Sequence, residues 1–429
     1  MNSLIIFALL VALLLTGMPI SIALGMSVLA FLFAFSTIPI EIVSQRLFTG
    51  LDQFAIMAIP FFILSGAFLT SGGVATRIVN FATTLVGAMH GGLALSAVLS
   101  CAFFAALSGS SPATVVAIGS IMIPAMVKQG YPKAFGVGVI ATSGGLGILI
   151  PPSIVMIIYA VSTNSSVGQL FIAGIVPGVL MALTLMLVTW LVAKKHNYPT
   201  LPQASLREIW RAFRESIWGL LIVVIVIGGI YGGIFTPTEA AAVSAVYAFV
   251  VSVFVYGDLK LRDVPKVLRD AANMSAMLLY IITNAILFSF LLTSENIPQQ
   301  LAQWIVEQGL SPWMFLLFVN VLLFFAGDFM EPSSIILILA PIFLPVAIKL
   351  GIDPIHLGIV MTLNMELGMI TPPVGLNLYV ASGLARMGLT EVTLAAAPWI
   401  LVVTAVLILV TYVPQIALWL PHLMYGIGT

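Results

Sequence analysis

The feature that most constrains this chain is a succession of apolar runs of membrane length, separated by short polar or Gly/Pro-rich breaks. A helix needs about 20 apolar residues to cross the roughly 30 Å hydrocarbon core of a bilayer. Only 7% of the 429 residues are Asp, Glu, Lys or Arg, whereas soluble domains carry about 25%. We therefore expect an all-α polytopic membrane protein, with apolar runs at roughly 4–16, 18–35, 54–70, 92–107, 134–150, 168–192, 216–235, 238–256, 272–293, 312–326, 357–371 and 390–413.

The rest of the composition narrows the possible functions. A formal net charge of zero gives no electrostatic reason to expect a nucleic-acid partner. Cys101 is the single cysteine, so neither an internal disulfide nor a cysteine metal cluster can form. The four histidines lack ligand spacing, and we expect no catalytic residues and no resident metal. The run from Leu4 has no basic residue before it and no cleavage site after it, which indicates a retained span.

Two apolar runs contain Gly/Pro breaks in the environment where a broken helix is most costly. One reads GGLGILIPPSIVMII from Gly144, and the other contains ELGMITPPVG from Glu366. Proline inside a helix removes a backbone hydrogen bond and clashes with the preceding turn, at a cost of about 3 kcal/mol. Unwound backbone at membrane depth is tolerated only where protein buries it or it lines a wet cavity. We read isolated glycines as helix-packing positions, and the two Pro-Pro breaks as functional.

The breaks belong to an internal repeat. FFAALSGSSPATVVAIGSIMIP from Phe103 matches FFAGDFMEPSSIILILAPIFLP from Phe324, and each is followed by a Gly-containing turn and then by a Pro-Pro break. Four landmarks recur in the same order at an offset of 220 to 222 residues. In each copy a small-polar loop separates two short apolar runs, which suits a helical hairpin that enters and leaves the membrane from one side.

The distribution of basic residues predicts that the two copies are inverted. The segments Lys194–Arg214 and Lys260–Arg269 hold five and four Lys/Arg, and short basic loops stay cytoplasmic. The first copy ends at this basic loop, whereas residues 412–429 after the second copy contain no Lys or Arg. Inverted repeats with paired, interrupted helices mark the binding sites of secondary transporters.

The two copies differ in their acids. Asp328, Glu331 and Glu366 fall in the second copy, whereas the first copy has no acid. Acids at membrane depth are costly and are functional candidates by default. The alternative is that they start helices, as Glu331 before Pro332 would. Glu239 we read as a capping acid.

A basic residue near the second break is a further charged candidate. Arg386 follows the second break in the string ASGLARMG. It is read as an interfacial anchor, with attraction of a carboxylate as the alternative role.

The chain resembles the large membrane (M) subunit of tripartite ATP-independent periplasmic (TRAP) transporters, in its DctM-like C4-dicarboxylate branch. The resemblance is carried by LLTGMPISIALG, MAIPFFILSGAFLTSGG, SGSSPATVVAIGSIMIPAM, GILIPPSIVMIIYA, GGIYGGIFTPTEAAAVSAVYAF, MSAMLLYIITNAILFSFLL, FMEPSSIILILAPI and PPVGLNLYVASG, and covers essentially the whole chain. It implies an ion-transporter-superfamily-like fold: an inverted repeat with two re-entrant hairpins and two unwound helices, working as an elevator in the bacterial inner membrane.

The resemblance also implies the site residues. A first Na⁺ would lie between the first hairpin tip and the first break, on Ser108, Ser110, Gly147, Ile150 and Pro152. By the repeat, a second Na⁺ would lie on Gly327, Gly368, Thr371 and Pro373. The substrate would lie between the hairpin tips, near Ser111, Thr114, Pro332, Ser333 and Asn377. Na⁺ is here a co-transported ion, and no organic cofactor is implied.

The implied function is Na⁺-coupled import of C4-dicarboxylates (malate, succinate, fumarate), with sialic acid or another organic acid as the alternative substrate. The implied partners are a periplasmic substrate-binding protein, membrane lipids and a small Q subunit, which we expect as another polypeptide because no Q-like segment precedes the M motifs. The expected organisation is scaffold helices and an arm in 1–90, a first transport repeat in 91–193, a basic loop and scaffold helices in 194–310, a second transport repeat in 311–412 and a C-terminal end in 413–429.

Two other function classes remain open on the sequence. An intramembrane serine hydrolase would use the Ser-rich loop, but no histidine lies within the paired breaks to act as its base. A passive channel or structural subunit would need no binding protein, so a flux assay without that protein separates it from a transporter.

Overall fold

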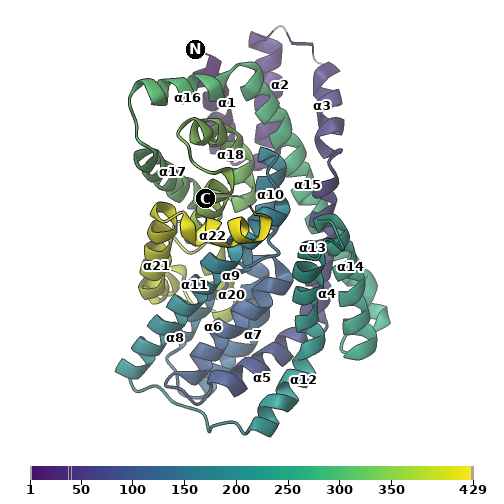
Figure 1. The fold of residues 1–429 in the computed structure, drawn as a ribbon, viewed down its shortest axis with the longest axis vertical. Helices are drawn as coiled ribbons and strands as arrows, with labels where there is room; N and C mark the ends of the chain where they lie inside the picture. The colour runs from purple at the N-terminus through teal and green to yellow at the C-terminus, as the bar shows by residue number, and fades with distance from the viewer. Residues whose placement is uncertain (1, 37, 40, 427–429) are drawn as a thin grey trace.

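The computed structural model describes residues 2–36, 38–39 and 41–426, and this part of the chain is helical throughout, without a strand (Figure 1). Met1 and residues 427–429 of the expected C-terminal end lie outside the described residues. The N-terminal half forms α1 (Asn2–Leu15), α2 (Ile20–Phe35), α3 (Glu41–Leu51), the 3₁₀ turn η1 (Phe54–Met57), α4 (Ala58–Ser71), α5 (Val74–Val86), α6 (Gly92–Ser108), α7 (Ser111–Lys128), α8 (Lys133–Ser143), α9 (Leu146–Leu149), α10 (Ile154–Thr163) and α11 (Val167–Lys195).

The C-terminal half repeats much of this order. It forms α12 (Leu206–Val223), the π-helical turn η2 (Val224–Gly228), α13 (Gly229–Tyr231), α14 (Pro237–Val250), the π-helical turn η3 (Val251–Val255), the 3₁₀ turn η4 (Leu261–Asp263), α15 (Val264–Ser294), α16 (Ile297–Glu307), α17 (Pro312–Gly327), α18 (Pro332–Lys349), α19 (Pro354–Met369), α20 (Leu376–Ala385), α21 (Leu389–Tyr412) and α22 (Gln415–Tyr425).

Eight helices among the described residues are long and apolar enough to cross a membrane, or nine if one bent pair counts as a span. That pair is the first Pro-Pro element, Lys133–Leu149 with Ile154–Thr163, bent by 40°. The first arms of the two hairpins, α6 and α17, have 17 and 16 residues and are too short for that test. The prediction of an all-α polytopic membrane protein is confirmed.

The two halves of the repeat have the same element order. A helical hairpin (α6–α7 or α17–α18) is followed by a broken helix (α8–α9–α10 or α19–α20). The hairpins lie in opposite halves of the molecule, α6 and α7 toward the bottom of Figure 1 and α17 and α18 toward its top. The packing is crossed, because α10 of the first half contacts α18 of the second, while α20 contacts α7.

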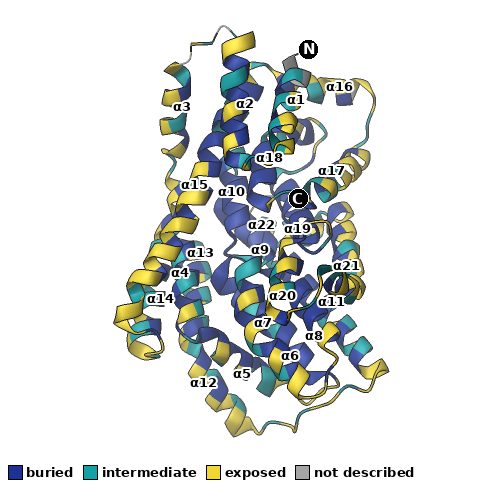
Figure 2. Cartoon of the chain, turned by 180° about the vertical axis from the view of Figure 1, so that it is seen from behind, coloured by how far each residue is buried: buried dark blue, intermediate teal, exposed yellow. Residues whose placement is uncertain are grey.

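A second group of helices flanks this pair of repeats. The helix α4 packs along α14, and α15 packs on α2, α3 and α4. Serine hydroxyls join α4 to α14 and to the η3 turn that follows it. Ser65 Oγ donates to Ser244 O at 3.3 Å, and Ser252 Oγ donates to Phe68 O at 2.9 Å. Buried residues concentrate in the repeats, whereas the flanking α12 has more exposed than buried residues (Figure 2).

The loop in the basic segment Lys194–Arg214 ends earlier than predicted. The sequence suggested a loop to Arg214 and a span from 216, but α12 begins at Leu206, so Arg207, Arg211 and Arg214 are helical. A capping box starts this helix: Glu208 N donates to Ser205 Oγ at 3.3 Å, and Ser205 N donates to Glu208 Oε2 at 2.7 Å. The expected boundary was wrong because basic residues were taken as a sign of a loop.

Glu239 has the predicted capping role. Thr236 is the N-cap of α14, its hydroxyl accepts from Glu239 N at 3.3 Å, and Thr236 N donates to Glu239 Oε2 at 2.8 Å. Arg386 is exposed and ends α20 in a left-handed conformation at φ 49°. Both side chains lie outside the site described below.

Replacement of Thr236 by alanine removes one half of the capping box of α14. Loss of an N-cap hydroxyl costs about 1 kcal/mol, so we expect Thr236→Ala to lower the thermal unfolding midpoint in detergent. Thr236→Ser keeps the hydroxyl and should retain the wild-type midpoint; equal midpoints for the alanine variant and the wild type would contradict the capping role.

Candidate cation and substrate site

The tip of the first hairpin is held by its own hydroxyls. The helix α6 ends at Ser108, Gly109 turns the chain at φ +60°, and α7 begins at Ser111. Ser108 Oγ lies 2.9 Å from Thr114 Oγ1, which donates to Ser110 O at 2.9 Å. The small residues SGSS therefore form a compact turn in which hydroxyl and carbonyl oxygens gather.

The first broken helix approaches this tip closely. A Cβ placed on Gly147 would lie 2.5 Å from Ser110 O and 2.8 Å from Thr114 Oγ1, so only glycine fits there. Beyond the Pro-Pro pair, whose peptide bond is cis, Ile154 N donates to Gly109 O at 3.4 Å. The structure thus brings Gly147 and the break against the hairpin tip.

Four of the five residues expected for the first Na⁺ site lie together. Ser108, Ser110 and Gly147 meet as described, and a Cβ on Gly109 would lie 2.8 Å from Pro152 O, which places that carbonyl at the tip. Ile150 is the C-cap residue of α9, and its side chain lies against Gly178 of α11. Ser153 closes the break by donating its hydroxyl to Ile148 O at 2.6 Å.

The second hairpin and break repeat this contact with different residues. Val374 N donates to Asp328 O at 3.1 Å, as Ile154 N does to Gly109 O in the first copy. Gly327 and Gly368 touch through their backbones, since a Cβ on Gly368 would lie 2.7 Å from Gly327 Cα. Thr371 Oγ1 donates to Leu367 O at 2.7 Å, and its oxygen remains able to face a cation.

The two half-sites differ in exposure. In the first copy Pro151, Pro152 and Ser153 are buried, and Gly66 of α4 packs on the backbone of Ser108. In the second copy Pro372, Pro373 and Val374 are exposed, together with Phe329 at 67%. A groove of about 500 Å³ separates this second tip (Phe329, Met330 and Glu331) from α1 and the start of α2. The first break is therefore buried within the described chain, whereas the second break and its hairpin tip lie at the surface of that chain.

A hydrogen bond between the two repeats marks the expected substrate site. Asn377 Nδ2, in the first turn of α20, donates to Ser111 Oγ at 2.6 Å, at the start of α7. Both side chains are fully buried, and Asn377 Oδ1 has no partner among the described residues. Thr114 lies one turn further along α7. Pro332 and Ser333 are buried at the start of α18, where Ser333 Oγ donates to Glu331 Oε1 at 2.6 Å.

The three acids of the second copy have different surroundings. Glu331 is the N-cap of α18 and accepts from Ser334 N at 3.2 Å, so its helix-start reading is confirmed. Asp328 is buried, and its Oδ1 has no partner among the described residues. Glu366 is fully buried, and its side chain lies against Gly145.

Sequence reasoning missed three contributors: Gly109, Gly145 and the backbone carbonyl of Asp328. Gly109 sits inside the recognised SGSS loop, so the need for a left-handed turn residue was a usable signal. The alignment of GLGILIPPS with ELGMITPPVG pairs Gly145 with Glu366, but only the tertiary structure reveals that the paired positions touch.

Comparison with known proteins identifies the family. The family described as "Tripartite ATP-independent periplasmic transporter, DctM component" matches residues 7–416. The chain belongs to the DctM family. Its location follows: it is a multi-pass protein of the inner membrane, a permease component of a tripartite transporter.

Named relatives cover nearly the whole chain. The "C4-dicarboxylate TRAP transporter large permease protein DctM" of Rhodobacter capsulatus is 64% identical over 99% of this chain and 100% of the relative. The protein of the same name from Pseudomonas aeruginosa is 56% identical over 93% of this chain and 94% of the relative. The "Sialic acid TRAP transporter large permease protein SiaM" of Vibrio cholerae is 38% identical over 97% of each chain.

Two solved transporters share the fold of this DctM protein. The YdaH transporter of Alcanivorax borkumensis aligns with a TM-score of 0.63 at 18% identity, over 90% of this chain and 89% of that chain. MtrF of Neisseria gonorrhoeae aligns with a TM-score of 0.56 at 14% identity, over 91% and 85%. At these identities the likeness concerns the fold alone.

Gly147→Ala tests the close approach of break and tip. The added methyl group overlaps Ser110 O, and overpacking a tight contact costs about 1–3 kcal/mol, so we expect a lower thermal unfolding midpoint. Gly383→Ala is the matched control, because Gly383 has nothing within 4 Å of its Cβ position. An equal effect of both substitutions on the midpoint would contradict the contact.

Proposed function

We propose that this chain is the large permease subunit of a TRAP transporter that imports C4-dicarboxylates such as malate, succinate and fumarate by Na⁺-coupled secondary active transport. The observation that carries the proposal is the pair of broken helices, each packed on a hairpin tip rich in oxygen atoms. The substrate class rests on the relatives named for C4-dicarboxylates, which are 64%, 56% and 49% identical to this chain.

Na⁺ fits the donor atoms at the two tips. Hydroxyls of Ser108 and Thr371 and backbone carbonyls at the breaks are hard oxygen ligands without full charge. Such a set suits a small monovalent cation, whereas divalent cations favour carboxylate cages. The proposed ligands are Ser108, Ser110, Gly147, Ile150 and Pro152 for one ion, and Gly327, Gly368, Thr371 and Pro373 for the other.

A dianionic substrate fits the helix starts at the tips and breaks. The helices α7, α10, α18 and α20 all begin at a tip or a break. A helix N-terminus offers unpaired N–H groups and the positive end of the helix dipole, which attract carboxylates. Ser111 and Asn377 hold two of these starts together at 2.6 Å, and we propose both as substrate ligands, with Thr114, Pro332 and Ser333 beside them.

The proposed mechanism is an elevator. The hairpins and broken helices would move as one body against α2, α4, α14 and α15, carrying Na⁺ and substrate together. The crossed packing of α10 on α18 and of α20 on α7 supports such a body, because it joins the two repeats. A small membrane Q subunit would brace the flanking helices, and a periplasmic binding protein would deliver the substrate.

Another organic acid is the second candidate substrate. Relatives named for isethionate and for sialic acid are 44% and 38% identical to this chain. A thermal-shift panel on the cognate binding protein separates the candidates. Stabilisation by succinate, malate or fumarate supports the dicarboxylate proposal, and selective stabilisation by sialic acid contradicts it.

Uptake of labelled succinate into proteoliposomes tests the coupling. We expect uptake to need Na⁺, the Q subunit and the binding protein together, because the ion gradient supplies the energy and the binding protein supplies the substrate. Full uptake with ATP or a proton gradient alone would refute Na⁺ coupling. Flux without the binding protein would indicate a channel instead.

The double substitution Ser108→Ala with Ser110→Ala tests the first ion site. Loss of the Ser108 hydroxyl and rearrangement of the tip should raise the half-saturating Na⁺ concentration about tenfold, equivalent to about 1.4 kcal/mol. Ser120→Ala is the control, since Ser120 is an exposed hydroxyl on α7 that binds only its own helix. An unchanged Na⁺ dependence of uptake in the double variant would remove both serines from the site.

A further inference from the structure

Glu366 is a carboxylate in the interior of the repeats with no evident partner. It lies on α19, its side chain is 0% exposed, and neither of its oxygens has a hydrogen-bond partner among the described residues. The ion pairs in the described part of the chain join Arg77 to Asp258 and Arg262 to Asp263, so neither Lys nor Arg neutralises Glu366. The functions proposed above do not use this side chain.

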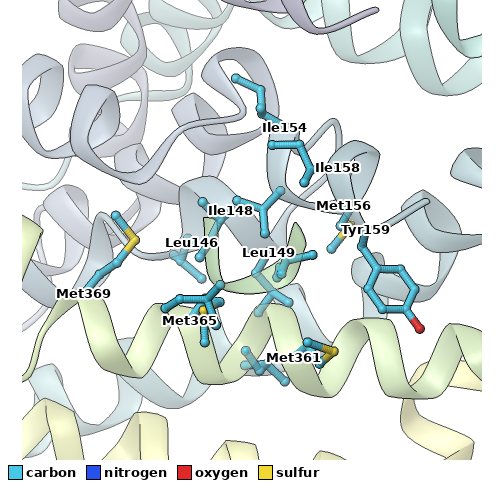
Figure 3. Packing of buried hydrophobic residues seen from close by; sticks show 14 of the residues in the cluster. Leu146, Ile148, Leu149, Ile154, Met156, Ile158, Tyr159, Met361, Met365 and Met369 are labelled. Carbon is cyan, nitrogen blue, oxygen red and sulfur yellow. The ribbon is translucent and has the colours of Figure 1, made fainter. Parts of the chain in front are cut away.

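The carboxylate lies where the two repeats cross. A Cβ placed on Gly145 would lie 2.5 Å from Glu366 Oε1, so the glutamate occupies the space that a side chain at Gly145 would need. Gly145 and Glu366 are equivalent positions of the repeat, the first residues of GLGILIPPS and ELGMITPPVG. Leu146 follows Gly145, and Met365 precedes Glu366. In Figure 3 these two neighbouring residues lie one above the other where α9 crosses α19.

The crossing links Glu366 to both breaks. Gly145 precedes Gly147 by two residues, and Glu366 precedes Gly368 by the same distance. Gly147 contacts the first hairpin tip, and Gly368 contacts the second. Glu366 is thus connected to the first break through its contact with Gly145 and to the second break through its own helix, α19. The proposed Na⁺ ligands themselves consist of neutral hydroxyls and carbonyls.

The energetics of burial indicate what this acid does. An isolated carboxylate inside a protein at membrane depth is strongly unfavourable unless a cation or hydrogen bonds compensate it. Two Na⁺ ions held by neutral ligands within one domain also repel each other. A single negative charge near both ions offsets the burial cost of the carboxylate and the repulsion between the ions. Each ion attracts the carboxylate more strongly in this poorly polar interior than it would in water.

We propose that Glu366 is the counter-charge shared by the two Na⁺ sites, a residue that sets the Na⁺ affinity of both without serving the substrate. This inference rests on the Na⁺ coupling proposed above. The asymmetry of the repeat then has a physical reason: the crossing has room for one side chain, so one copy supplies glutamate and the other glycine.

The test measures Na⁺ binding to the full chain, purified in detergent with its co-expressed membrane partner. Thermal unfolding midpoints are recorded over a NaCl series, with choline chloride keeping the ionic strength constant. A bound ion stabilises the folded state by RT ln(1 + [Na⁺]/Kd), so a fit to the midpoints gives the Na⁺ concentration of half-maximal occupancy. We expect Glu366→Gln, which keeps the shape and removes the charge, to raise the half-maximal Na⁺ concentration at least tenfold. Glu366→Asp should restore part of the affinity.

Two further variants keep the inference falsifiable if Glu366→Gln does not fold. Gly145→Ala overlaps the carboxylate and should also weaken Na⁺ binding, although it leaves every acid in place. Glu391→Gln removes an exposed acid from the first turn of α21 and should bind Na⁺ like the wild type.

Three results would overturn the inference. The same half-maximal Na⁺ concentration in Glu366→Gln and in the wild type would show that the charge does not serve the ions. Wild-type Na⁺ binding by that variant, with loss of substrate-coupled proton uptake in proteoliposomes, would assign a proton to Glu366 instead. A wild-type protein that Na⁺ does not stabilise at all would refute the proposed Na⁺ coupling itself, and this inference with it.

Discussion

Backbone groups that leave a helix at membrane depth must find partners within the protein, and the rest of this structure depends on that requirement. Each broken helix meets it by pairing with the tip of a hairpin: Ile154 N with Gly109 O, and Val374 N with Asp328 O. Side chains satisfy further carbonyls, as Ser153 Oγ does for Ile148 O. A break and its hairpin therefore form one structural unit. The repeat supplies two such units, which pack against each other through α10 with α18 and α20 with α7.

Much of this fold could be predicted because its strongest signals are local. Apolar run length predicted the spans, and the four ordered landmarks predicted both hairpins and both breaks. The start of α12 was mispredicted, although Arg207, Arg211 and Arg214 have the spacing of one helix face and Ser205 with Glu208 forms a capping-box pattern. The segment was read as a loop from its charge alone, although the periodicity of its arginines indicates a helix.

The candidate site could be predicted only in part. Ser108, Ser110, Gly147 and Pro152 share two adjacent motifs, and the structure brings them together. The position of the Ile150 side chain depends on the path of α11, which no local pattern encodes. The contacts of Ser111 with Asn377 and of Gly145 with Glu366 join residues more than 200 positions apart, and depend on how the repeats cross.

The hydrogen bond between Asn377 and Ser111 also bears on how a transporter returns to its starting conformation without substrate. A secondary transporter must reset without its cargo, and polar groups left bare in an emptied site would oppose passage through the membrane. Here Asn377 Nδ2 donates to Ser111 Oγ at 2.6 Å, which satisfies part of the polar capacity of both side chains. If Ser111 and Asn377 receive the substrate as proposed, an arriving carboxylate has to replace that hydrogen bond, so the same two residues would also lower the cost of an empty site.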